Sequence, residues 1–244
     1  MSIWETICDP FEKSDSVQHD QVWYNGIVNE TMVKGIFISF EGLDGSGKST
    51  QISRVRSFLE SCGRRVVMVR EPGGTVISEK IREIILDVGN RGMAPAAEAL
   101  LYAASRAQLT AEVIRPSLDA GMDVVCDRYV DSSLAYQGWG RQLGFEQVLE
   151  INRLSVNGTF PDITFLLDIP PEEAMRRTSG KGRADRIEEE APEFHRRVYE
   201  GFNRLAALYA GRYRVIDGTG LPGEVSRQIQ QILKKELIKR RGGV

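Results

Sequence analysis

The sequence has few of the residues that build disulfide frameworks or histidine-rich metal sites. Among 244 residues there are three cysteines, Cys8, Cys62 and Cys126, which lie far apart and form no Cys-x-x-Cys pair. An odd, scattered set of this kind is typical of reduced thiols in a cytoplasmic protein. The two histidines, His19 and His195, are too few for a histidine-built metal site.

An excess of charge of one sign and long apolar runs are also lacking. The chain has 32 Lys and Arg residues against 34 Asp and Glu residues, a net charge of −2. It therefore has no basic excess of the kind that marks nucleic-acid-binding proteins. No run reaches the roughly 18 apolar residues of a transmembrane helix, and the N-terminus lacks the basic start of a secretory signal. We expect neither nucleic acid nor a membrane as a partner, and a cytoplasmic location.

Residues 1–33 differ from the rest because their apolar residues follow no sustained periodicity. We interpret this stretch as an N-terminal extension, flexible or loosely docked. A translation start at Met32 is a rival explanation. Residues 34–244 then form one domain, which is long enough to bury a core without disulfides.

From Gly35 onward, apolar strand-like runs alternate with helical patterns. The predicted strands are Gly35–Glu41, Arg65–Arg70, Met122–Asp127, Ile163–Asp168 and Tyr213–Asp217. The predicted helices are Gly47–Cys62, Val76–Asp87, Pro95–Asp119, Glu172–Thr178, Pro192–Ala210 and Gly223–Lys239. Strands that alternate with helices pair in parallel and carry helices on both faces. The sequence therefore predicts an α/β fold with a five-stranded parallel sheet flanked by helices.

A glycine-rich segment joins the first predicted strand to the first predicted helix. It matches Gly-x-x-x-x-Gly-Lys-Ser and reads Gly42-Leu43-Asp44-Gly45-Ser46-Gly47-Lys48-Ser49-Thr50. Its glycines let backbone N–H groups turn toward phosphate oxygens, and the helix N-terminus adds a favourable dipole. Lys48 is suited to neutralise the β and γ oxygens, and the Ser49 hydroxyl to ligate Mg²⁺. Because a strand precedes the segment and a helix follows it, we predict a phosphate-binding loop of the P-loop NTPase fold, with ATP as its ligand.

The end of the third predicted strand narrows the class of P-loop protein. It reads Asp127-Arg128-Tyr129, not a pair of carboxylates, and the chain has no Asn-Lys-x-Asp motif for reading guanine. Arg128 would lie where α/β folds bind ligands and can bridge two phosphates. An ion pair on the surface is the plainer alternative. Taken with the loop, the pattern favours a small-molecule kinase.

Five stretches together are far more specific than the phosphate-binding loop alone. They are Phe40–Thr50, Arg70–Thr75, Asp127–Tyr129, Ala135–Gly138 and Asp185–Glu188. In these stretches the chain resembles the bacterial thymidylate kinase family, over nearly all of Gly35 to Lys239. The resemblance implies a nucleoside monophosphate kinase domain over residues 34–244. It also implies direct, in-line transfer of the γ-phosphoryl group of ATP·Mg²⁺ to dTMP, giving dTDP for dTTP synthesis, and a homodimer.

The resemblance also implies roles for individual residues. The catalytic residues would be Lys48, Arg128 and a positively charged residue of the lid, for which Arg183 is preferred over Lys181 and Arg186. The residues that bind dTMP would be Asp44, Arg70, Tyr102, Arg106, Arg128, Ser133, Tyr136 and Gln137. The metal site would involve Ser49, Asp127 and Glu188. Tyr102 stands where the family usually has Phe, and it shares a helix face with Arg106 at a spacing of four residues.

Two alternatives stay open on the sequence alone. A kinase for another pyrimidine (deoxy)nucleotide would keep the loop chemistry and change the pocket, and the phenol of Tyr102 leaves room for a different base preference. A non-catalytic ATP-binding regulator would use the N-terminal extension as a docking arm. The presence of Lys48, Ser49 and Arg128 argues against this second alternative.

Overall fold

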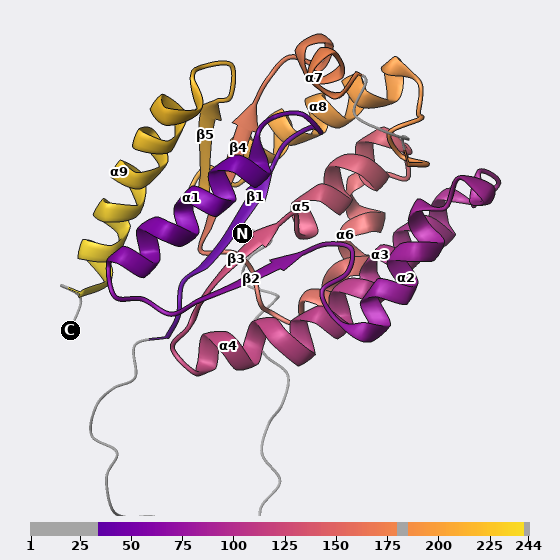
Figure 1. The fold of residues 1–244 in the computed structure, drawn as a ribbon. Coiled ribbons are helices and arrows are strands. Elements are labelled where there is room, and N and C mark those ends of the chain that lie inside the picture. The colour runs from indigo at the N-terminus through magenta and orange to yellow at the C-terminus, as the bar shows by residue number, and fades with distance from the viewer. Residues whose placement is uncertain (1–33, 180–184, 242–244) are drawn as a thin grey trace, which may run out of the picture. The chain divides into compact units, whose positions relative to one another are not determined.

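Five parallel strands form a single sheet in the computed structural model, which describes residues 34–179 and 185–241 (Figure 1). The N-terminal extension and the lid residues Lys181 and Arg183 lie outside the described residues. The strands are β1 (Phe37–Glu41), β2 (Val66–Arg70), β3 (Asp123–Asp127), β4 (Ile163–Asp168) and β5 (Tyr213–Asp217). Their order is β2-β3-β1-β4-β5. The predicted fold class is confirmed, and each predicted strand overlaps an observed one.

Helices cover both faces of this sheet (Figure 1). Those before β3 are α1 (Lys48–Ser61), α2 (Val76–Leu86), η2 (Val88–Asn90), α3 (Pro95–Leu109), η3 (Thr110–Ile114) and α4 (Arg115–Asp119). Those after β3 are α5 (Val130–Ser133), η4 (Leu134–Gly140), α6 (Phe145–Val156), α7 (Pro171–Thr178), α8 (Pro192–Leu208) and α9 (Pro222–Arg241). No helix in the described part of the chain is long and apolar enough to cross a membrane.

The alternation of side chains along β1 divides the core into two halves. Ile38 and Phe40 face α1 and α9, which lie side by side, and they pack with Leu59 and Ile229 (Figure 1). Phe37 faces the opposite side, where its ring meets Tyr129 edge-on at 4.9 Å between centroids. Burial on both faces explains why this strand is an almost unbroken apolar run.

The predicted helix Pro95–Asp119 is in fact three consecutive segments. A π-helical turn, η3, separates α3 from α4. Pro116 lies immediately after this turn. Because proline has no N–H and its ring clashes with the carbonyl four residues back, a regular helix cannot continue through it. The wider turn accommodates that interruption.

The stretch between β3 and β4 holds helices that the sequence did not predict. Along α6 the buried face carries Asn152 and Ser155 beside Val148 and Val156. Polar residues on a buried face weaken the apolar periodicity on which a prediction rests. The segments α5 and η4 are short, and η4 includes two glycines.

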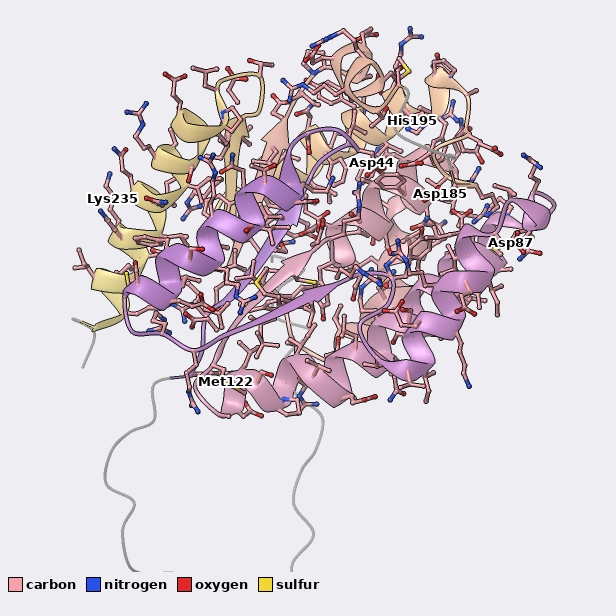
Figure 2. The ribbon with its side chains drawn as sticks, viewed as in Figure 1. Asp44, Asp87, Met122, Asp185, His195 and Lys235 are labelled. Atoms are coloured by element: carbon pink, nitrogen blue, oxygen red, sulfur yellow. The ribbon has the colours of Figure 1, made fainter. Side chains whose placement is uncertain are left out.

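The strand register brings the phosphate-binding loop and the loops after β2 and β3 together. Phe40 pairs with Asp127, and Asp127 pairs with Arg70, so β1, β3 and β2 end almost level. Asp44 and Asp185 lie toward this end of the sheet, whereas Met122, before β3, lies at the opposite end (Figure 2). Ligands of open α/β sheets bind outside the carboxyl ends of the strands, which places the candidate site at this edge.

Candidate functional site

The loop Gly42–Thr50 bends around a cavity of about 350 Å³ at the carboxyl end of β1. At Gly42 (φ +130°) a Cβ atom would lie 2.6 Å from the carbonyl oxygen of Leu167. At Gly45 (φ +83°) it would lie 2.8 Å from that of Ala174. These positions therefore require glycine, because the loop backbone packs closely against β4 and α7 there. Such a loop, followed directly by the N-terminus of α1, forms a site for anions.

Lys48 is the cation at the centre of this loop. Its ammonium group is buried and donates hydrogen bonds to the carbonyl oxygens of Gly42 and Leu43, each at 3.0 Å. Burial, together with nearby Arg128, lowers the pKa of Lys48 to about 8. A phosphate oxygen bound in the cavity would place a negative charge beside the Lys48 ammonium group. It would therefore stabilise the charged form of Lys48.

Arg128 lies between the phosphate-binding loop and a second cavity. One guanidinium nitrogen donates to the carbonyl of Gly42 at 3.0 Å, and the other donates to Asp44 Oδ1 at 2.7 Å. The guanidinium also lies over the ring of Tyr136, 5.1 Å from its centroid. Its backbone has φ of 67°, a conformation that non-glycine residues rarely adopt and that clusters at functional sites.

Asp44 supplies the negative charge that balances these two cations. Burial alone would raise the pKa of its carboxyl group, but Arg128 and Lys48 outweigh that effect and hold the pKa well below its usual range. Lys48 Nζ lies 3.8 Å from Asp44 Oδ1. The three groups therefore stay charged near neutral pH and leave one net positive charge facing the cavities.

The second cavity, of about 180 Å³, adjoins the first. Six of the eight residues predicted to bind dTMP line it, namely Asp44, Tyr102, Arg128, Ser133, Tyr136 and Gln137. Arg70 lines the first cavity instead and donates to Pro72 O and Glu79. Most of the residues that the resemblance assigned to dTMP therefore line one cavity, and they come from α3, α5 and η4 as well as from the loops.

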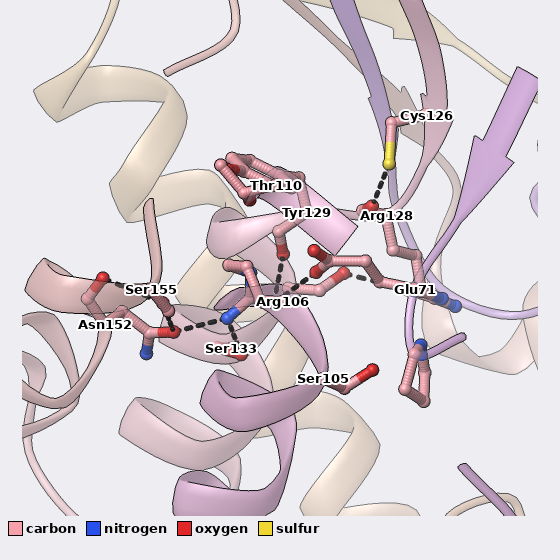
Figure 3. A network of polar contacts seen from close by, with 12 residues as sticks. Glu71, Ser105, Arg106, Thr110, Cys126, Arg128, Tyr129, Ser133, Asn152 and Ser155 are labelled. Carbon is pink, nitrogen blue, oxygen red and sulfur yellow. Dashed lines mark hydrogen bonds and ion pairs between the residues drawn. The ribbon is translucent and has the colours of Figure 1, made fainter. Parts of the chain in front are cut away.

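Arg106 is not among the residues that line the second cavity. Its buried guanidinium donates to Ser133 Oγ at 3.0 Å and also to Glu71 and Asn152 (Figure 3). Its predicted role was to reach the base edge. In the described conformation it instead supports Glu71 and Ser133, two residues of the cavity wall.

Glu71 and Arg82 line both cavities. Glu71 belongs to the stretch Arg70–Thr75 that carries the resemblance, whereas Arg82 was not predicted. Arg82 donates to Pro72 O at 2.9 Å, and burial lowers its pKa. It follows Ser78 by one helical turn and precedes buried Ile85 on α2. An arginine on the buried face of an amphipathic helix was the sequence signal that could have identified it.

The residues predicted to hold a metal divide between the two cavities. Ser49 and Asp127 line the first, whereas Glu188 lines the second. Asp127 Oδ1 is buried and has no hydrogen-bond partner among the described residues. Within residues 34–179 and 185–241, no group of three acidic, histidine or cysteine side chains is arranged to enclose a metal. A hydroxyl and an unpartnered carboxylate oxygen fit Mg²⁺, which usually keeps several of its waters.

Of the three candidates for the positively charged lid residue, Arg186 is the one that the structure describes. It is buried, pairs with Glu98 at 2.7 Å and donates to the carbonyl of Ile85 at 2.8 Å. It lines neither cavity. Arg186 therefore has a supporting position here, and Lys181 and Arg183 lie outside the described residues.

Comparison with known proteins places these features in one family. The family model described as thymidylate kinase matches residues 40–229. The thymidylate kinase of Pelotomaculum thermopropionicum is 53% identical over 188 residues, which cover 77% of this chain and 87% of that protein. The thymidylate kinase of Thermoanaerobacter sp. (strain X514) is 46% identical over 205 residues, 84% of this chain and 100% of that protein.

A solved structure agrees with the sequence matches. The crystal structure of thymidylate kinase from Ehrlichia chaffeensis is similar with a TM-score of 0.67 and 32% identity, and the match covers 82% of this chain and 99% of that one. The chain belongs to the thymidylate kinase family, the enzymes that phosphorylate dTMP to dTDP.

Proposed function

We propose that the first cavity takes the phosphates of ATP, that the second takes dTMP, and that the phosphoryl group passes between them beside Arg128. The observation that carries this proposal is the position of Arg128, which lines both cavities and contacts the phosphate-binding loop and Asp44. A planar guanidinium with several fixed donors is suited to bridge two anionic groups.

The proposed transfer is direct and needs no phosphoenzyme. An oxygen of the acceptor phosphate is already anionic, so it attacks the γ-phosphorus without a general base. The new P–O bond forms as the bond to the β,γ-bridging oxygen breaks, and ADP carries away that electron pair. Catalysis then consists of positioning and charge stabilisation by the loop N–H groups, Lys48 and Arg128.

Ser49 and Asp127 are proposed to hold Mg²⁺ in the first cavity, Asp127 through the metal's waters. The ion would neutralise phosphate charge. Glu188, which was predicted to lie near the metal, lines the acceptor cavity. Arg183 keeps its proposed role as a further cation for the migrating group.

The walls of the second cavity suit a flat, partly apolar base beside a phosphate. Tyr102 offers an aromatic face for stacking, and Tyr136 offers a ring that would crowd a ribose 2′-hydroxyl. Gln137 and Ser133 supply polar groups for the base edge and sugar. Arg82, where the two cavities meet, is proposed to face the acceptor phosphate.

An apolar face on α2 and α3 is proposed to pair two copies of the chain. Ile77 and Ile84 are exposed on α2, and Leu100 is 58% exposed on α3. Ala97, Ala104 and Ala107 are exposed on α3 and extend this apolar face. Exposed apolar side chains on two helices that pack together are typical of an interface.

A cytoplasmic location, predicted from the scattered cysteines, completes the proposal.

The acceptor assignment predicts which nucleotides support release of ADP from ATP·Mg²⁺. We expect strong turnover with dTMP and little with UMP, CMP, AMP or thymidine, because the second cavity combines a base-stacking wall with arginines for a phosphate. The measurement is ADP release across this panel, with and without residues 1–33. A preference for another monophosphate would reassign the pocket. ATP binding with no acceptor-dependent turnover would favour the alternative of a non-catalytic ATP-binding regulator.

The low pKa of Lys48 predicts proton uptake when ATP binds. Near pH 8 about half of the Lys48 amines are neutral, and a bound phosphate raises the pKa, so we expect uptake of about half a proton per ATP. Below this pH the amine is already charged, and above it ATP affinity falls. Calorimetry in two buffers with different ionisation enthalpies measures the uptake. Lys48→Met should abolish it, while exposed Lys34→Met should leave it unchanged. Equal uptake in Lys48→Met would contradict this assignment.

The apolar face predicts the oligomeric state. We expect sedimentation velocity to show a dimer for the wild-type chain and a monomer for Leu100→Glu, because a charge would be buried unpaired in the interface. Leu208→Glu is the matched control, since Leu208 is 60% exposed at the end of α8 and away from this face. A wild-type monomer, or a Leu100→Glu dimer, would contradict the proposed interface.

A further inference from the structure

A buried carboxylate, Glu98, lies behind the second cavity and lines neither cavity. It is on α3, one helical turn before Tyr102, and its exposed fraction is 0%. Glu98 Oε1 accepts a hydrogen bond from Gln137 Nε2 at 2.8 Å. Glu98 Oε2 accepts from Arg141 at 2.9 Å and pairs with Arg186 at 2.7 Å. The Glu98 side chain thus connects α3 to Gln137 of η4, to Arg141 directly after η4, and to Arg186.

The two arginines keep this carboxylate ionised. Burial alone would raise the pKa of Glu98, but hydrogen bonds from Arg141 and Gln137 outweigh that effect and hold the pKa below its usual value. Arg141 also pairs with Glu190 at 2.5 Å, so two acidic and two basic groups balance in this cluster. An ionised carboxylate can accept hydrogen bonds but has none to donate.

This constraint decides which end of the Gln137 amide faces the second cavity. The Gln137 side chain is almost fully buried and lines that cavity. Its NH₂ group must face Glu98, because an amide oxygen in that place would meet a carboxylate oxygen with no proton between them. The carbonyl oxygen is then the end available to a ligand.

We infer that Glu98 is a positioning residue that sets base specificity by fixing the Gln137 amide with its carbonyl oxygen toward the base. This inference rests on the proposed function, in which the second cavity holds the base. An acceptor at this place pairs with the N3–H of thymine or uracil and is repelled by the lone pair on N3 of cytosine. Glu98 thereby favours dTMP over dCMP without touching either nucleotide.

The test is the ratio of kcat/KM for dTMP to that for dCMP. The amide introduced by Glu98→Gln can accept or donate, so it satisfies Gln137 in either orientation. We expect the ratio to fall at least ~10-fold, since one base-edge hydrogen bond is lost for dTMP and gained for dCMP. The KM for ATP should not change. In a Gln137→Ala background, Glu98→Gln should change the ratio by less than ~2-fold, because there is no amide left to orient.

Two further variants separate positioning from a general loss of stability. Asp123→Asn removes a buried carboxylate that pairs with Arg64 at the opposite end of the sheet, and it should lower stability without changing the ratio. If Glu98→Gln does not fold, Glu98→Asp takes its place in the test. The shorter side chain keeps the negative charge but moves it away from the Gln137 amide, so a smaller fall in the ratio is expected. An unchanged ratio in a folded Glu98→Gln or Glu98→Asp variant would overturn the inference, as would an equal effect without Gln137. A wild-type enzyme inactive on dTMP would instead refute the proposed function.

Discussion

The ion pair between Arg128 and Asp44 is the contact on which the site depends, because it holds a cation where the two cavities meet, the cavities proposed to take the phosphates of ATP and of dTMP. Arg128 reaches this place through an unfavourable backbone conformation at the end of β3, where its N–H donates to the carbonyl of Phe40. Asp44 belongs to the phosphate-binding loop, so the pair joins β3 to that loop. Displacing the end of β3, or the end of β1 from which the loop begins, would separate the Arg128 guanidinium from one of the cavities.

Buried carboxylate–arginine pairs support the walls around this contact. Three of them join elements that are distant in sequence: Glu71–Arg106, Glu98–Arg186 and Asp131–Arg212. The desolvation cost of such pairs offsets much of their Coulombic attraction, so they contribute little net stability. What they provide is fixed geometry, since a side chain displaced from its partner would leave a charge buried without compensation. Glu71, Ser133 and Gln137, three polar residues that line the second cavity, are held by members of these pairs.

The parts of the site that could be predicted from the sequence are those encoded by contiguous residues or by strand order. The loop Gly42–Thr50 is a local motif, and Arg128 follows from its place at the end of a strand in a parallel sheet. The supporting layer could not be predicted in this way. The resemblance assigned Tyr102 and Arg106 to the dTMP pocket, and their spacing puts them on one helix face. Neither indicates that Asn152 and Ser133 would hold Arg106 outside the lining of the pocket.

The same limit explains the helices that were missed between β3 and β4. Their buried faces carry polar residues, Asn152 and Ser155, that are satisfied by neighbours from other elements or from their own helix. Polar residues of this kind are also frequent in loops, so the sequence alone does not distinguish such a helix from a loop. Glu98 was overlooked for a related reason, because a lone glutamate in the first turns of a helix is ordinarily explained by the helix dipole.

The most direct test of the central claim is the rate of dTDP formation by Arg128→Ala in a single turnover, with enzyme in excess over ATP and with dTMP saturating. If Arg128 stabilises the phosphoryl group as it passes between the cavities, this rate falls at least ~10²–10³-fold, as on removal of other preorganised charge stabilisers. Arg56→Ala, which removes an exposed partner of Glu60, should leave the rate unchanged. A rate for Arg128→Ala close to that of the wild type would contradict the claim.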